Sequence, residues 1–260
     1  MKHVSLFLAA GCVVLLSLSA LVGSAPMELG ETFAALIGQG TEASRIIVWE
    51  IRLPRAVAAF GVGAALGLSG AGLQGLLQNP LAGPGVLGVS AFASLGAVIA
   101  IYFGLAAAGS FAVPLAAILF SGLAVALLLF AAGRGASTVT LLRALSLGEE
   151  TAASLGVNPA RTRLLIIVGT SLLAGASVAV AGTIGFVGMV APHIVRPLVK
   201  HDPQRILLPS ALAAGGMLLG ADMLVRVLPF SQELKLGVAA ALFGAPVFIW
   251  IAARLGGSTR

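Results

Sequence analysis

The chain has 260 residues and a net charge of +6, yet only 9% of its residues are charged, 59% are hydrophobic and its mean hydropathy is +1.09. Soluble proteins are about 45–50% apolar and about 25% charged. The composition therefore excludes a soluble globular domain and predicts an all-α protein that crosses a membrane several times. The chain contains only three lysines and a single cysteine, Cys12, which argues against nucleic-acid binding and excludes disulfides and cysteine-based metal sites.

Eight apolar stretches are long enough to be considered as membrane helices, which need roughly 17–25 residues. In chain order they cover about residues 4–23, 56–76, 88–107, 111–132, 164–182, 184–200, 206–225 and 236–253. The first stretch is also compatible with a signal peptide, but its length and the following Pro26 favour a retained span. The sixth is the shortest and carries Pro192 and His193.

The distribution of lysine and arginine predicts the orientation, because cytoplasmic segments of membrane proteins are enriched in both residues. With the N-terminus inside, the inner segments hold ten of these residues and the outer segments hold five. Both termini are therefore expected in the cytoplasm. Two longer stretches lie between spans, 27–55 on the outside and 134–163 on the inside.

Several kinds of active site are missing from the sequence. No lysine follows a glycine, so a phosphate-binding P-loop ending in Gly-Lys is excluded. The three histidines show no paired ligand spacing, which argues against a dedicated metal site. We therefore expect no catalytic residues, no metal and no cofactor bound by this chain.

An ordered series of motifs runs along almost the whole chain. The motifs are RLPR (52–55), VGAALGLSG (62–70), QGLLQNPLA (74–82), GVS (88–90), LSLGEETAASLG (145–156), AGTIGFVG (181–188), PHIVR (192–196), ELKLG (233–237) and GAPVF (244–248). In these motifs the chain resembles the permease subunit of FecCD-type ABC importers, which carry iron chelates or vitamin B12.

The resemblance implies a single transmembrane permease domain over residues 1–260 in the bacterial cytoplasmic membrane. It implies a homodimer that works with two ATP-binding-cassette subunits, which use ATP, and with an external substrate-binding protein. An iron chelate, either a siderophore complex or haem, is the expected cargo, and cobalamin is the alternative.

One departure from the family pattern concerns the number of spans. The family fold has ten spans, whereas about eight are present here. The stretch from Thr138 to Leu142 runs directly into Arg143 and the motif at 145–156. About two helices are thus expected to be missing at a junction near 142/143, and a shortened variant that docks partners without transporting is the alternative function.

Three arginines are expected at outer membrane ends, and the resemblance implies that they dock the binding protein. They are Arg52, Arg55 and Arg226. A guanidinium can hold a carboxylate through two parallel hydrogen bonds, which suits this task. Interfacial anchoring is the alternative for Arg52 and Arg55. For Arg226 it is an ion pair with Asp222, four residues earlier.

The inner stretch at about 143–163 resembles the family's segment that couples the permease to its ATPase. The residues expected to make this contact are Leu147, Gly148, Glu149, Ala152, Leu155, Gly156 and Pro159. An ordinary solvated loop is the alternative. A further group, Gly182, Gly185, Gly188 and Pro192, is expected either to line the pathway or to allow close helix packing.

Overall fold

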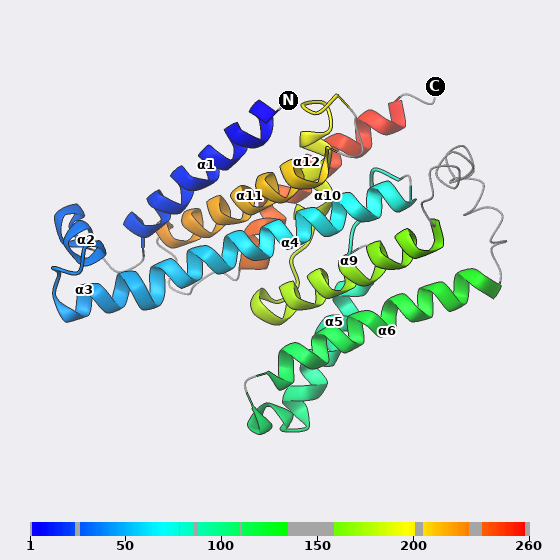
Figure 1. Cartoon of the computed structure of the whole chain (residues 1–260), viewed down its shortest axis with the longest axis horizontal. Helices are drawn as coiled ribbons and strands as arrows, with labels where there is room; N and C mark the ends of the chain where they lie inside the picture. The colour runs from blue at the N-terminus through cyan, green and yellow to red at the C-terminus, as the bar shows by residue number, and fades with distance from the viewer. Residues whose placement is uncertain are drawn as a thin grey trace. The chain divides into compact units, whose positions relative to one another are not determined.

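The computed structural model describes residues 2–23, 27–77, 79–85, 88–109, 111–134, 159–200, 205–228 and 236–257. Over these residues the chain forms helices and turns, and no strand occurs among them, which confirms the predicted all-α class. The long helices are α1 (Lys2–Leu21), α4 (Leu53–Leu77), α5 (Val89–Tyr102), α6 (Ala112–Arg134), α9 (Pro159–Ala181), α11 (Leu207–Val227) and α12 (Leu236–Gly257) (Figure 1). The shorter ones are α2 (Leu29–Leu36), α3 (Glu42–Ile46), η1 (Ile47–Arg52), η2 (Leu105–Ala108) and α10 (Val187–Val195).

Four helical segments are long and apolar enough to cross a membrane, and three more apolar helices are shorter over their described residues. The second of the four runs from Glu42 to Leu77 through α3, η1 and α4 without a break. It begins well before the predicted start at residue 56. The π-helical turn η1 ends at Arg52, two residues before Pro54, and such a turn accommodates the backbone irregularity that a proline introduces. The exact number of spans and the side on which each terminus lies stay predictions.

The sixth predicted span, 184–200, contains a helix of only nine residues, α10. A helix of this length is about 13.5 Å long, less than half of the roughly 30 Å thickness of the hydrocarbon core. Residues 182–186, just before it, are not helical. Hydropathy predicted an apolar segment correctly here, but the segment is only partly helical.

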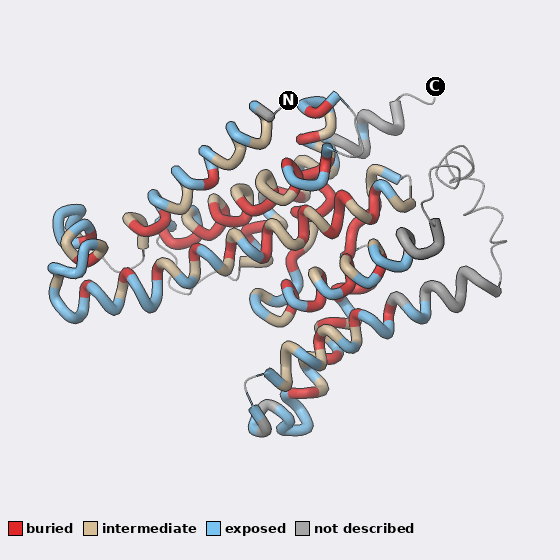
Figure 2. The backbone as a smooth tube through the Cα atoms, in the orientation of Figure 1, coloured by how far each residue is buried: buried red, intermediate tan, exposed pale blue. Residues whose placement is uncertain are grey.

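The chain divides into two compact units, residues 1–67 with 184–260 and residues 68–183. In the first unit, α1 lies along α11, and α11 also contacts α10 and α12. Both α4 and α11 carry buried stretches, drawn red in Figure 2. Ala56 and Ala59 of α4 and Leu219 of α11 form a buried apolar cluster. Close backbone approach is needed between these helices, because a Cβ atom at Gly63 would lie 2.5 Å from the carbonyl oxygen of Ala214.

In the second unit, α5, α6 and α9 pack against one another. A Cβ atom at Gly175 of α9 would lie 2.6 Å from the hydroxyl of Ser121, so this glycine lets the two helices approach. The Ser121 hydroxyl contacts the carbonyl oxygen of Ser171 at 2.9 Å and that of Ile118 at 2.7 Å. Small residues thus support close packing in both units, as the glycine content predicts. The prediction of one permease domain over 1–260 stays a prediction.

Candidate functional site

The three arginines predicted at outer membrane ends gather at one end of the first unit. Arg52 is the last residue of η1, Arg55 lies in the first turn of α4, and Arg226 lies in the last turn of α11. The C-terminus of α1 lies at the same end. We call these three residues together with Asp222 the arginine cluster.

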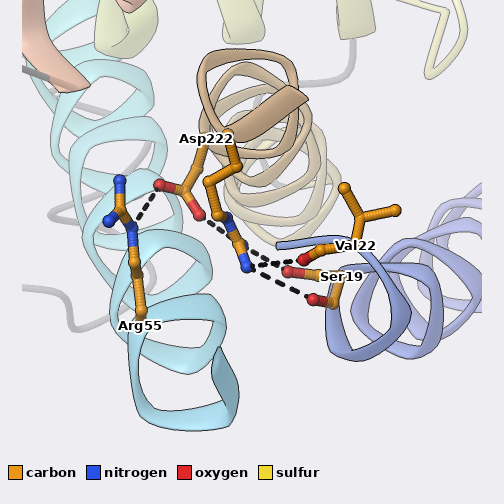
Figure 3. A network of polar contacts seen from close by, with 5 residues as sticks. Ser19, Val22, Arg55 and Asp222 are labelled. Carbon is orange, nitrogen blue, oxygen red and sulfur yellow. Dashed lines mark hydrogen bonds and ion pairs between the residues drawn. The ribbon is translucent and has the colours of Figure 1, made fainter. Parts of the chain in front are cut away.

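Asp222 of α11 lies between two of the arginines (Figure 3). One of its carboxylate oxygens accepts a hydrogen bond from Nε of Arg55 at 2.9 Å, and the other is paired with Nη2 of Arg226. The side chain of Asp222 is 2% exposed and that of Arg226 is 4% exposed, whereas that of Arg55 is 34% exposed. The ion pair between Asp222 and Arg226, proposed as the alternative role of Arg226, is therefore present.

Arg226 also caps α1. Its Nη1 donates to the carbonyl oxygens of Ser19 and Val22 at 3.3 and 3.2 Å, and its Nη2 donates to the hydroxyl of Ser19 at 2.5 Å. The last four carbonyl groups of a helix have no partner within the helix and carry partial negative charge. A guanidinium at this place satisfies them both by hydrogen bonding and by charge.

Arg52 completes the cap from the other side. It is 3% exposed, and its Nη1 donates to the carbonyl oxygens of Ala20 and Leu21 at 3.1 and 3.0 Å. A Cβ atom at Gly23 would overlap the Arg52 guanidinium, so the absence of a side chain at this position makes room for it. Two arginines from distant parts of the sequence thus share the four consecutive carbonyl groups of residues 19–22.

The four residues of the cluster comprise three guanidinium groups and one carboxylate. Buried charges are costly unless they are paired and hydrogen-bonded. The α1 carbonyls and Asp222 supply such partners to Arg52 and Arg226, and both side chains are buried. Arg55 is the member of the cluster whose side chain an external molecule can best reach.

Sequence reasoning placed these arginines at helix ends, where the structure also has them, but it did not find the capping of α1. Ser19 and Gly23 were not singled out, and no sequence spacing links them to residues 30 to 200 positions away. Only the Asp222–Arg226 spacing of four residues was a signal in the sequence.

The remaining predicted residues are placed as follows. Of the coupling residues, Pro159 begins α9, where a proline is favoured because the first helical N–H has no partner. The other six, Leu147 to Gly156, and the junction near 142/143 lie outside the described residues. Gly182 has φ +73° and its N–H donates to the carbonyl oxygen of Val178, which closes the C-terminus of α9.

Gly185 lies two residues before α10 begins, and Gly188 and Pro192 lie within this helix. Gly188 and Pro192 are buried, and Pro192 is the sixth of the nine residues of α10. Their packing is compatible with either of the two predicted roles. Within the part of the chain that the structure describes, no group of three His, Cys, Asp or Glu side chains could hold a metal ion.

Comparison with known proteins relates the chain to a transport family. A sequence model of the FecCD transport family matches residues 11–142 and 136–254. The vitamin B12 import system permease protein BtuC of Yersinia enterocolitica is 34% identical over 311 residues, which covers 94% of this chain and 92% of the relative. The uncharacterized ABC transporter permease protein YvrB of Bacillus subtilis is 35% identical over 292 residues, covering 85% of this chain and 83% of the relative.

A solved structure shares the fold. It is a chain described as that of a metal-chelate type ABC transporter in an inward-facing conformation, with a TM-score of 0.80 and 24% sequence identity. The superposition covers 98% of this chain and 100% of the other.

Proposed function

The chain belongs to the FecCD transport family of ABC importer permeases, and we propose that it moves a bulky metal chelate into the cell. It is a multi-pass protein of the bacterial inner membrane and is not itself an enzyme, since ATP is hydrolysed by a separate subunit of such importers. The observation that carries the proposal is the match of the family model from residue 11 to residue 254.

Two cargoes fit this proposal. The sequence analysis favoured an iron chelate, either a siderophore complex or haem. Relatives at 34% and 35% identity are named as vitamin B12 permeases, from Yersinia enterocolitica and Klebsiella pneumoniae, and they favour cobalamin. In this class of importer the external binding protein determines most of the specificity for the cargo.

The proposed assembly is a homodimer with two ATPase subunits and an external binding protein. The gathering of three guanidinium groups in the arginine cluster supports a partner that presents carboxylates. Within the cluster, the exposure of Arg55 makes it the first contact for such a carboxylate. Arg52 and Arg226 are buried, and their hydrogen bonds also stabilise the C-terminal end of α1.

The shortening of the chain supports a second candidate function. The family model matches two stretches of the chain, and these stretches overlap at residues 136–142, immediately before the predicted junction. The alignment with the Yersinia relative spans 311 residues, more than the 260 of this chain, so the relative contains residues that this chain lacks. A permease without two central helices could keep its docking surfaces and lose its pathway.

An uptake experiment tests both candidates. The chain, its ATPase and its binding protein are placed in vesicles, and ATP-dependent accumulation of radiolabelled cobalamin, haem and iron siderophores is measured. Accumulation of one cargo supports the importer and names its substrate. A chain that is abundant in the membrane and binds its ATPase, but accumulates none of them, supports the non-transporting variant.

A further inference from the structure

Phe186 has a backbone conformation that is unusual for a bulky residue. Its φ is +66° and its ψ is −37°, and the N–H of Val187 donates to the carbonyl oxygen of Gly185 at 2.8 Å. A hydrogen bond between residues i and i+2 around a positive φ defines the rare form of the γ-turn, which is strained. Such strain persists only where the surroundings enforce it, and it is concentrated at ligand clamps and switch regions.

Helix α12 holds this turn in place. A Cβ atom at Gly244 would lie 2.6 Å from the Cβ of Phe186, so Phe186 occupies the space where a side chain of α12 would otherwise be. The rings of Phe186 and Phe248 lie with their centroids 5.6 Å apart and their planes tilted by 39°. We call Gly244 and Phe248, one helical turn apart, the Phe186 seat.

The seat lies near the middle of a predicted span. Gly244 is the ninth residue of the 22-residue helix α12, about 12 Å from its beginning at 1.5 Å per residue. If α12 crosses a hydrocarbon core of about 30 Å, the turn at Phe186 lies near mid-depth. Non-helical backbone at this depth is tolerated only where protein encloses it or where it lines a water-filled cavity, as in the broken helices of transporters.

Both helices that meet at the seat contain a proline. Pro246 lies between Gly244 and Phe248, and Pro192 lies inside α10. A proline in a helix interior removes one backbone hydrogen bond and weakens the helix at that point. The ring therefore connects the beginning of a short helix to the weakened part of a long one.

From this geometry we infer that Phe186 is a positioning residue of the transport pathway, whose ring must leave its seat on α12 during the transport cycle. While the ring is seated, residues 185–187 stay in the strained turn. When it leaves, Phe186 can adopt a negative φ and the beginning of α10 can move. The inference rests on the proposed importer function. It adds to that function a specific movement, of Phe186 and the beginning of α10 away from α12, which the family match does not give.

A reversible cross-link tests whether the seat opens. Phe186→Cys and Gly244→Cys are introduced together with Cys12→Ala, which removes the native thiol. Cβ atoms in disulfides lie about 3.5–4.5 Å apart, so a small shift from the present spacing allows the bond. We expect oxidation to abolish uptake and reduction to restore it, while the amount of chain in the membrane and its binding to the ATPase stay unchanged.

A second pair of variants covers the case in which the reduced double-cysteine chain is already inactive. Gly244→Ala fills the seat, whereas Gly220→Ala adds a methyl group on α11 that meets no described atom within 4 Å beyond the nearby backbone of its own helix. We expect Gly244→Ala to lower the amount of cargo moved per ATP hydrolysed, and Gly220→Ala to leave this ratio unchanged. A merely structural role would lower the amount of folded chain but not the ratio.

Two results would overturn the inference, and they can be told apart from failure of the proposed function. Undiminished uptake by the fully cross-linked chain would show that the seat stays closed during transport. An unchanged transport ratio in Gly244→Ala would show that transport does not depend on Phe186 occupying the seat. Absence of uptake by the Cys12→Ala chain, despite its presence in the membrane, would refute the importer function itself, and the inference with it.

Discussion

At the scale of single residues, Asp222 holds two arginines that come from different helices. It is buried, and one of its carboxylate oxygens pairs with Arg55 while the other pairs with Arg226. If this carboxylate is removed, Arg226 stays buried beside Arg52 and loses the one carboxylate that pairs with it among the described residues. A buried cation without its partner is costly, since removing one member of a buried pair costs about 3–5 kcal/mol.

We therefore expect Asp222→Ala to destabilise the protein by about 3 kcal/mol, measured as a lower midpoint of thermal unfolding in detergent. Glu50→Gln is the matched control, because Glu50 is an exposed carboxylate in η1 of the same unit. An equal shift in both variants would show that the loss of negative charge, and not the buried pairing, sets the stability.

Docking of the binding protein should depend on Arg55 more specifically than on Arg52. Arg55→Gln removes the charge of the most exposed member of the cluster without placing a second carboxylate against Asp222, so we expect weaker binding of the binding protein and unchanged ATPase association. Arg52→Gln removes a charged cap of the buried end of α1 and should lower the amount of folded chain as well. Binding is measured on vesicles at equal chain abundance, and unaltered binding in Arg55→Gln would contradict the docking role.

At the scale of elements, the contact between α4 and α11 in the first unit depends on glycines. A Cβ atom at Gly67 would lie 2.5 Å from the Cβ of Ala214, and the backbone of Ser210 is also close. Two helix backbones cannot approach this closely with a side chain between them.

Gly67→Ala should therefore force α4 away from α11 and destabilise the protein by roughly 1–3 kcal/mol, the usual cost of overpacking. Gly61→Ala on the same helix is the control, because its added methyl group would meet none of the described atoms within 4 Å apart from the adjoining backbone of α4. The midpoint of thermal unfolding should be lower in Gly67→Ala and nearly unchanged in Gly61→Ala. Equal stability would mean that α4 and α11 do not pack this closely.

Coupling to the ATPase is a prediction about a segment that the structure does not describe. Gly156→Trp places a large side chain where the family pattern expects a turn, so we expect the ATPase to be uncoupled. Stimulation of ATP hydrolysis by the loaded binding protein should be lost, whereas docking at the arginine cluster should persist. Normal stimulation would remove the coupling assignment.

At the scale of the whole molecule, the open question is whether the shortened chain still surrounds a pathway. Insertion of two apolar spans after Leu142 restores the number of helices expected for the family and leaves the downstream orientation unchanged. We expect uptake to appear or to rise in the lengthened chain. Uptake that is no higher, with normal membrane abundance, would contradict the interpretation that helices are missing at this junction.

Much of the helical organisation could be predicted, because a membrane span must be apolar over a length set by the bilayer. All eight predicted stretches contain a helix. The predicted helix boundaries were less accurate, because hydropathy shows that a segment is apolar but not whether its backbone is helical. It extended the sixth span over residues 184–186 and 196–200, which are not helical, and it began the second span at 56 although the helical segment begins at Glu42.

The candidate site was predicted in part. The sequence pattern predicted three arginines at outer helix ends. In the structure these arginines lie at helix ends and close to one another. Their burial could not be predicted, because an arginine side chain is long enough to reach carbonyl groups of a helix that is far away in sequence. Arg226 caps residues about 200 positions before it, and no local pattern marks such a contact.

The sequence by itself determined the membrane location, the helical class and the family, because composition and ordered motifs are local properties that each stretch carries alone. Only the tertiary structure decided which arginines are buried as caps of α1 and which one is exposed. It alone showed the strained turn at Phe186 seated against Gly244. Both features arise from contacts between distant segments, and their energies depend on how closely the helices pack rather than on the residues within any one helix.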